Sequence, residues 1–156
     1  MTIPNQMKAI DIKEFGEPEV LIPVIVPVPE PASDQVLIKN DAVGVNRPDV
    51  AQRTGNYPVP PDANPLPGLE VAGEVVAKGD NAGKWKIGDK VTALTHGGGY
   101  AEYTAVNHGH CLKWPTGFDA ILSAAIPETY FTVHYNVFTR AGLKAGETIL
   151  VHGGSS

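Results

Sequence analysis

The sequence predicts an α+β protein that is mainly β, with an irregular antiparallel barrel or sandwich first and helices after it. Three observations favour this class. The chain scatters 17 glycines and 14 prolines along its length, which is typical of many short strands joined by turns. The texture becomes helical after Gly117. Finally, the β-branched run Thr148–Val151 precedes small residues, as in a parallel strand that opens into a nucleotide-binding turn.

Composition narrows the function classes. The chain has 156 residues, 42% hydrophobic and 19% charged, which suits a folded domain with a sizeable core. Its net charge of −5 without a basic cluster argues against nucleic acid as a partner. Cys111 is the only cysteine, so an intrachain disulfide is excluded. The first residues lack the pattern of a signal peptide, and no apolar run is long enough to span a membrane. We therefore expect a cytoplasmic protein.

Strands are expected where β-branched and apolar residues cluster between turn residues. Val20–Val28 contains Pro23 and Pro27 and is therefore expected at a sheet edge. Pro58–Gly68 is expected to be a semi-rigid surface loop, because five prolines rule out regular structure there. Gly97–Gly99 is expected to be a flexible turn and not a phosphate loop. The remaining expected strands are Met7–Ile12, Gln35–Asn40, Val71–Ala77, Lys90–Leu94 and Tyr100–Val106.

Two helices are expected in the last third of the chain. Asp119 is a suitable N-cap for a helix through Ala125. Pro127 fits the first turn of a second helix, Glu128–Ala141, because its missing N–H is not needed there. Gly142 is expected to end this helix. An apolar stripe follows its helical spacing, at Phe131, His134, Val137, Phe138 and Ala141.

Four motifs in one order and spacing carry a family resemblance. They are Gly44-Val45-Asn46-Arg47-Pro48-Asp49-Val50, Pro67-Gly68-Leu69-Glu70-Val71-Ala72-Gly73, Gly88-Asp89-Lys90-Val91 and Ala124-Ala125-Ile126-Pro127-Glu128-Thr129. Together they resemble the medium-chain dehydrogenase/reductase superfamily, and specifically its zinc-free NADPH quinone oxidoreductase branch. The resemblance implies a GroES-like catalytic domain over residues 1–126. Residues 127–156 would then be a linking helix and the first strand and phosphate loop of an incomplete Rossmann cofactor domain.

The resemblance also implies that no metal is bound. Zinc-dependent members hold their catalytic ion where this chain has Asn46, Leu69 and, approximately, Pro127. A catalytic zinc needs about three protein ligands, and neither Leu nor Pro provides one. His108-Gly109-His110-Cys111 looks like a metal cluster, but on a strand the adjacent cysteine would point away from the two histidines. We expect Cys111 to be a small buried apolar residue.

A hydride transfer to a quinone or conjugated enone fits a site of this kind. Without a Lewis acid, oxidising a simple alcohol is difficult, whereas these acceptors delocalise the incoming electrons. The protein then mainly has to orient the nicotinamide and donate hydrogen bonds to a developing oxyanion. NADPH in preference to NADH, and a homodimer as the intact assembly, are implied by the resemblance alone.

The resemblance places catalytic roles on two residues. Asn46 would lie near nicotinamide and substrate, although an asparagine can equally shape the turn before a short helix. Tyr57 would cover the substrate pocket and donate to the oxyanion, or else anchor a loop. Glu70 matches the glutamate that neighbours the metal in zinc-dependent members, and we expect it to make a structural hydrogen bond.

Cofactor contacts are expected at Asn46, Arg47, Thr132, Gly153 and Gly154. Arg47 has the alternative of a surface ion pair with Asp49. Thr132 would meet the nicotinamide amide unless its hydroxyl bonds back to a carbonyl of its own helix, and Thr129 is a weaker candidate for the same role. The two glycines would form the visible half of the phosphate loop.

Two other functions remain open. If a glycine followed Ser156, Gly153-Gly154-Ser155-Ser156 would complete a Gly-x-Ser-x-Gly elbow, with Ser155 as the nucleophile of an α/β-hydrolase. That fold needs a strand–helix alternation that the preceding residues do not show. The other alternative is a non-enzymatic GroES-like binding module. We expect the 156 residues alone to be nearly inactive, because most contacts to the cofactor phosphates would be missing.

Overall fold

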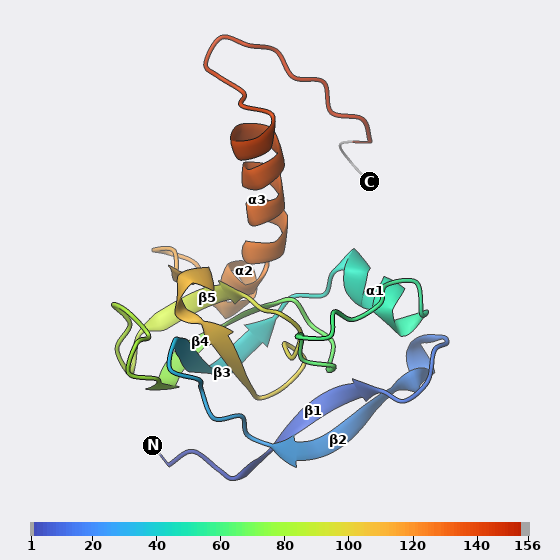
Figure 1. Ribbon diagram of the computed structural model, residues 1–156, viewed down its shortest axis with the longest axis vertical. Helices are drawn as coiled ribbons and strands as arrows, with labels where there is room; N and C mark the ends of the chain where they lie inside the picture. Colours follow the sequence, from blue (N-terminus) through green and yellow to red (C-terminus); the bar gives the residue numbers. More distant parts are fainter. Residues whose placement is uncertain (1, 154–156) are drawn as a thin grey trace.

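Every strand pair in the computed structural model, which describes residues 2–153, is antiparallel. β1 and β2 form a two-stranded sheet, and the other five strands form a second sheet in the order β6-β3-β4-β5-β7 (Figure 1). The strands are β1 (Gln6–Ile12), β2 (Leu21–Pro27), β3 (Gln35–Val43), β4 (Glu70–Lys78), β5 (Lys90–Leu94), β6 (Tyr103–Asn107) and β7 (Cys111–Lys113). This is the mainly β, irregular arrangement that the sequence predicts.

The helical segments are short. α1 (Arg47–Arg53) follows β3, and α2 (Ala120–Ala124) and α3 (Pro127–Val133) follow the last strand. One-turn 3₁₀ helices precede β2 and β7, at η1 (Pro18–Val20) and η2 (His108–His110). A π-helix, η3 (His134–Arg140), continues α3. Asp119 caps α2 as expected, with its side chain accepting from the Leu122 N–H.

Residues 100–102 join the two sheets. The Ile10 N–H donates to the Tyr100 carbonyl at 2.8 Å, and the Glu102 N–H donates to the Lys8 carbonyl at 3.1 Å. The Glu102 carbonyl in turn accepts from the Asn40 N–H of β3. The strand predicted to begin at Tyr100 therefore begins at Tyr103, because the residues before it divide their hydrogen bonds between β1 and β3.

Residues 36–38 of β3 are buried and separate two apolar clusters. Val36 and Ile38 contribute to a cluster with β4, β5 and Cys111. Leu37, on the opposite face, packs with Met7 and Tyr103 under the β1–β2 hairpin. This alternation along one strand explains why the hairpin covers the sheet. It also confirms that Cys111 is a buried apolar residue.

The predicted edge strand and the two predicted loops are present in the structure. β2 pairs with β1 alone, as expected of a strand that contains two prolines. Residues 58–68 form no regular structure. The glycine turn at 97–99 is confirmed as a turn, but its glycines pack closely against that loop. A Cβ on Gly97 would lie 2.2 Å from the Asn64 carbonyl oxygen, so this position excludes any side chain.

The long helix that starts at Pro127 departs from the prediction in type. It spans the expected residues and ends before Gly142, whose φ is +69°. From His134 onward, however, it is a π-helix, and the Ala141 N–H bonds to the Asn136 carbonyl five residues back. The Asn136 side chain also donates to the Thr132 carbonyl at 2.9 Å, which diverts a backbone acceptor of the α pattern.

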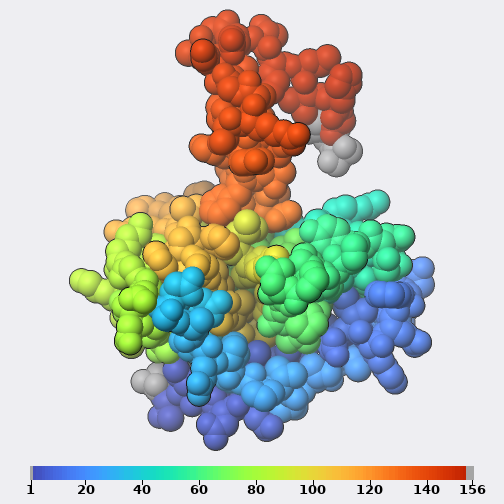
Figure 2. Space-filling model, in the orientation of Figure 1, coloured from blue at the N-terminus to red at the C-terminus, as the bar shows by residue number. Residues whose placement is uncertain are grey.

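This helix stands away from the sheets (Figure 1) and projects from the body of the molecule in the space-filling view (Figure 2). Much of its apolar stripe is exposed. Phe138 is 51% exposed. Among residues 2–153, no helix combines the length and apolar character needed to cross a bilayer.

The strand predicted at Thr148–Val151 is absent. These residues have no regular secondary structure, and Leu150 is 78% exposed. A parallel strand is stable only beside neighbours that satisfy its backbone groups, and no described segment lies there to pair with it. Gly154 and Ser155 lie outside the described residues, so the structure gives no account of the phosphate loop or the serine elbow.

Candidate functional site

Asn46 lies where β3 passes into α1. Pro48 occupies the first turn of the helix, and Asp49 is its third residue. The Asn46 N–H donates to the Asp49 carboxylate at 2.8 Å, which is the reciprocal half of a capping box. The sequence therefore begins a helix directly at the candidate residue, and the helix start fixes the Asn46 main chain.

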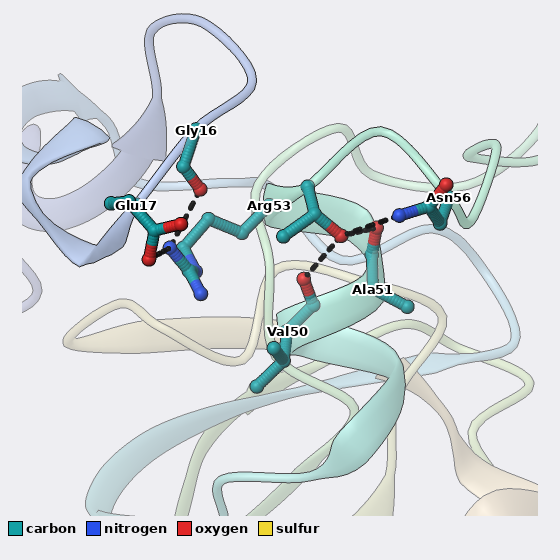
Figure 3. A network of polar contacts seen from close by, with 7 residues as sticks. Gly16, Glu17, Val50, Ala51, Arg53 and Asn56 are labelled. Atoms are coloured by element: carbon teal, nitrogen blue, oxygen red, sulfur yellow. Dashed lines mark hydrogen bonds and ion pairs between the residues drawn. The ribbon is translucent and has the colours of Figure 1, made fainter.

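The other end of α1 is fastened to the β1–β2 hairpin (Figure 3). The Arg53 guanidinium donates to the Gly16 carbonyl at 2.6 Å, and the Gly16 N–H donates to the Arg53 carbonyl at 3.1 Å. Glu17 lies 3.9 Å from the guanidinium, but its side chain is 87% exposed. Two reciprocal hydrogen bonds, more than this distant ion pair, hold the helix that presents Asn46.

Glu70, the first residue of β4, lies beneath Asn46 and is 2% exposed. Its Oε1 accepts from Asn46 Nδ2 at 2.8 Å, and its Oε2 accepts from the Glu128 N–H at 2.9 Å. Gly44 leaves room for this carboxylate, since a Cβ there would lie 2.0 Å from Glu70 Oε1. The structural hydrogen bond expected of Glu70 is present, and it is shared between Asn46 and the first turn of α3.

A second buried carboxylate supports the same region. Asp49 is 5% exposed, and its Oδ2 accepts from the Tyr100 hydroxyl at 3.0 Å as well as from the Asn46 N–H. Burial, and then the negative charge of Asp49, raise the pKa of Tyr100. Burial and the charges of Glu70 and Asp49 also raise the pKa of Glu128. The site is thus a cluster of acidic groups around one amide.

Two of the expected site residues lie apart from this hydrogen-bonded cluster. Tyr57 borders a hollow of about 50 Å³ together with Leu69, which directly precedes Glu70. Tyr57 is therefore near the position that holds a histidine in zinc-dependent members. Arg47 is exposed, and its guanidinium makes no ion pair with Asp49, whose Oδ2 accepts from Asn46 and Tyr100.

The threonines of α3 differ from each other. Thr129 donates its hydroxyl back to the Ala125 carbonyl at 3.1 Å, so it adopts the arrangement that was the alternative for Thr132. Thr132 lies four residues after Glu128 and hence on the same face of the helix, with an exposed side chain. Gly153 lies in a turn with φ +64°, far along the chain from these groups.

Within residues 2–153, no three His, Cys, Asp or Glu side chains are grouped so that they could hold a metal ion. His108 and His110 belong to a 3₁₀ turn, and the Cys111 side chain lies in the core. Burial raises the pKa of the Cys111 thiol to about 12, so it has no thiolate character at neutral pH.

Sequence reasoning missed Asp49 and Tyr100 as parts of the site. The spacing Asn46-x-x-Asp49 is a capping pattern that would have drawn attention to Asp49. Tyr100 gave no such signal, because it lies 51 residues from Asp49 in the sequence and only the fold brings the two together.

Residues 32–116 match the family described as the alcohol dehydrogenase GroES-like domain. The chain belongs to this GroES-like family. The match covers more than half of the chain and includes Asn46, Asp49, Glu70 and Tyr100. It confirms the GroES-like fold and the resemblance to medium-chain dehydrogenases/reductases.

Relatives of this GroES-like chain include quinone oxidoreductases from Lama guanicoe and Homo sapiens, each 44% identical over 96% of the chain. The chain spans 46% of the length of these relatives. Among solved structures, a mycobacterial quinone oxidoreductase is 34% identical, with a TM-score of 0.81, over 96% of this chain and 46% of that one. The human synaptic vesicle membrane protein VAT-1 homolog-like protein is 31% identical, with a TM-score of 0.81, over 89% and 45%.

Proposed function

We propose that this GroES-like region belongs to a zinc-independent oxidoreductase, which transfers a hydride from NADPH to a quinone or a conjugated enone. The observation that carries the proposal is the pair Asn46–Glu70. Leu69 stands at a position where zinc-dependent members have a metal ligand. The carboxylate of the next residue, Glu70, accepts from the Asn46 amide and from the Glu128 backbone N–H. The names of the relatives, quinone oxidoreductases at 44% identity, support the same class.

NADPH, when bound, supplies the hydride and leaves as the oxidised cofactor. Two polar residues of this chain fit the nicotinamide end of the cofactor. Asn46 lies at the start of α1, and Thr132 lies on the same face of α3 as Glu128; Glu70 bonds both Asn46 and Glu128. Both offer amide or hydroxyl groups suited to a carboxamide. Arg47, exposed beside Asn46, would contact the cofactor or the acceptor. Gly153 and Gly154 would belong to the phosphate loop.

Tyr57 would act on the acceptor. It lines the hollow next to Leu69, and among residues 2–153 its hydroxyl has no hydrogen-bond partner. A flat apolar face with a free donor suits a quinone whose carbonyl oxygen gains negative charge as the hydride arrives. Leu69 would keep water and cations away from that oxygen.

We also infer that the domain boundary lies at residues 126 and 127. Two features support it: the GroES-like match ends at residue 116, and the helix that begins at Pro127 leaves the body of the sheets (Figure 1). Residues 127–156 would then connect to a Rossmann cofactor domain. Assembly of the intact protein as a homodimer rests on the family resemblance alone.

The test is a screen of the full-length protein for NADPH oxidation with quinones and with conjugated enones. Asn46→Ala and Tyr57→Phe should each lower turnover by about tenfold or more, as expected when a donor to the transition state is lost. Asn56→Ala is the matched control, because it removes another asparagine near α1, whose side chain bonds only Thr54 in an exposed position.

Two further measurements accompany that screen. Metal analysis should find less than one zinc per chain, and a chelator should leave turnover unchanged. A stoichiometric zinc whose removal abolishes turnover would contradict the proposal. So would a protein that oxidises NADPH with neither class of acceptor.

A further inference from the structure

Glu70 distributes its two oxygens between two different parts of the site. Oε1 accepts from the Asn46 side chain, and Oε2 accepts from the backbone N–H of Glu128. Both partners are donors, so both carboxyl oxygens of Glu70 act as acceptors. Glu70 is almost wholly buried, and the missing Cβ of Gly44 leaves the space that its carboxylate fills. The carboxylate joins β4 to α1 and α3.

This geometry decides how the Asn46 amide is oriented. An asparagine amide can turn over and exchange its oxygen for its nitrogen, and a carboxylate tolerates only the nitrogen. We propose that Glu70 is a positioning residue: it fixes the donor–acceptor orientation of the Asn46 side chain and couples that orientation to the first turn of α3. The inference rests on the proposed function for its catalytic consequence, but the orientation itself is a property of this chain.

Asp49 completes the positioning from the other side. It holds the Asn46 main chain while Glu70 holds the side chain, so neither half of the residue is free to rotate. Tyr100 in turn holds Asp49. A ligand that approaches Asn46 would meet a fixed amide, whose ordering has been completed during folding and not during binding.

Glu70→Gln is the decisive variant, since it keeps the size of the side chain. A glutamine offers one oxygen and one NH₂, so it cannot accept at both of the positions where Glu70 accepts from Asn46 and Glu128. Either one contact is lost or the Asn46 amide turns over. Adding Asn46→Asp restores a donor–acceptor pair with reversed polarity. Glu74→Gln is the matched control, because Glu74 lies on the same strand but pairs with Lys90 at 3.6 Å.

The first arm uses the 156-residue chain labelled with ¹⁵N. In the wild type, one side-chain N–H of Asn46 should be protected from hydrogen exchange, and the Glu128 backbone N–H should be protected as well. Glu70→Gln should abolish protection of at least one of them, while Glu74→Gln should leave both. Unchanged Asn46 and Glu128 signals in Glu70→Gln would overturn the proposal, whatever the activity of the protein.

The second arm uses the full-length enzyme with NADPH and a quinone. Glu70→Gln should lower kcat by about tenfold or more, and its melting temperature should lie below that of the double variant. Glu70→Gln with Asn46→Asp should regain stability but not kcat, because an aspartate has no amide. Full turnover in Glu70→Gln would refute the catalytic role. An inactive wild type would refute the proposed function and leave the exchange experiment to decide the positioning.

Discussion

The hydroxyl of Tyr100 donates to the buried carboxylate of Asp49 across 3.0 Å, although the two residues lie 51 positions apart. This contact ties the segment between the two sheets to the helix that presents Asn46. It also sets the ionisation of the tyrosine, since burial and the adjacent negative charge both disfavour the phenolate.

Tyr100→Phe should reduce the free energy of unfolding by about 1–3 kcal/mol, because it removes one donor from a buried carboxylate. Urea unfolding at pH 7 measures the loss. Tyr135→Phe is the control, since Tyr135 is 59% exposed and its hydroxyl has no hydrogen bond within the described residues. Equal stabilities of the two variants would show that the Tyr100–Asp49 bond adds nothing net.

The burial of Tyr100 and the adjacent charge of Asp49 also predict that folding stability depends on pH. The folded pKa of Tyr100 is raised above its ordinary value of 10.0, so the folded state retains a proton that the unfolded state loses. The stabilisation is therefore complete below pH 10 and is lost as the pH rises toward the folded pKa. Between pH 9 and 11, wild-type stability should fall more steeply than that of Tyr100→Phe. Parallel curves would contradict the raised pKa.

Gly44→Ala should destabilise the fold more than Gly117→Ala. Gly44 has no positive φ, and its added Cβ would meet the Glu70 carboxylate, whereas Gly117 has φ +84° and open space around it. The second variant therefore measures backbone strain alone, about 1–2 kcal/mol. Gly44→Ala should lower the free energy of unfolding by about 1–3 kcal/mol more than Gly117→Ala does. The added Cβ overpacks against Glu70, which cannot move without breaking its hydrogen bonds. Thermal unfolding of both variants tests this order.

Arg53→Met should destabilise the chain by about 1.5–3 kcal/mol, because the variant keeps the apolar stem and loses the charged hydrogen bond to Gly16. Glu17→Gln should change stability by less than about 0.5 kcal/mol, since the Glu17 carboxylate is exposed and distant. Chemical denaturation of both variants separates the hydrogen bond from the ion pair. A larger effect of Glu17→Gln would assign the fastening of α1 to electrostatics.

Cys111 should resist thiol reagents in the folded chain. Its pKa is raised by burial from 9.0 to about 12, which lowers the thiolate fraction at pH 8 by about a thousandfold. Burial also blocks access to the sulfur. Labelling should therefore follow unfolding, with one thiol reacting rapidly in denaturant. Rapid labelling in native buffer would show that β7 separates readily from the core.

Local sequence signals were sufficient to predict strand edges, helix starts and helix ends, because these features depend on residues close together in the sequence. The prolines placed β2 at an edge, Asp119 began α2, Gly142 ended the long helix, and the four motifs predicted the family and its fold. Asn46 became a candidate site residue through its motif, a role that stays a prediction, while its spacing to Asp49 matches the capping geometry of α1. These features depend on backbone preferences and hydrogen bonds within a few residues, which the sequence states directly.

Contacts between distant segments were decided by the tertiary structure alone. No local pattern in the sequence pairs Tyr100 with Asp49, or places the Glu70 carboxylate between Asn46 and the start of α3. Packing of distant segments brings these groups together across dozens of residues. The run Thr148–Val151 shows the converse. Its β-branched residues favour an extended backbone, but a strand also needs a neighbour to satisfy its amides, and propensity cannot supply one.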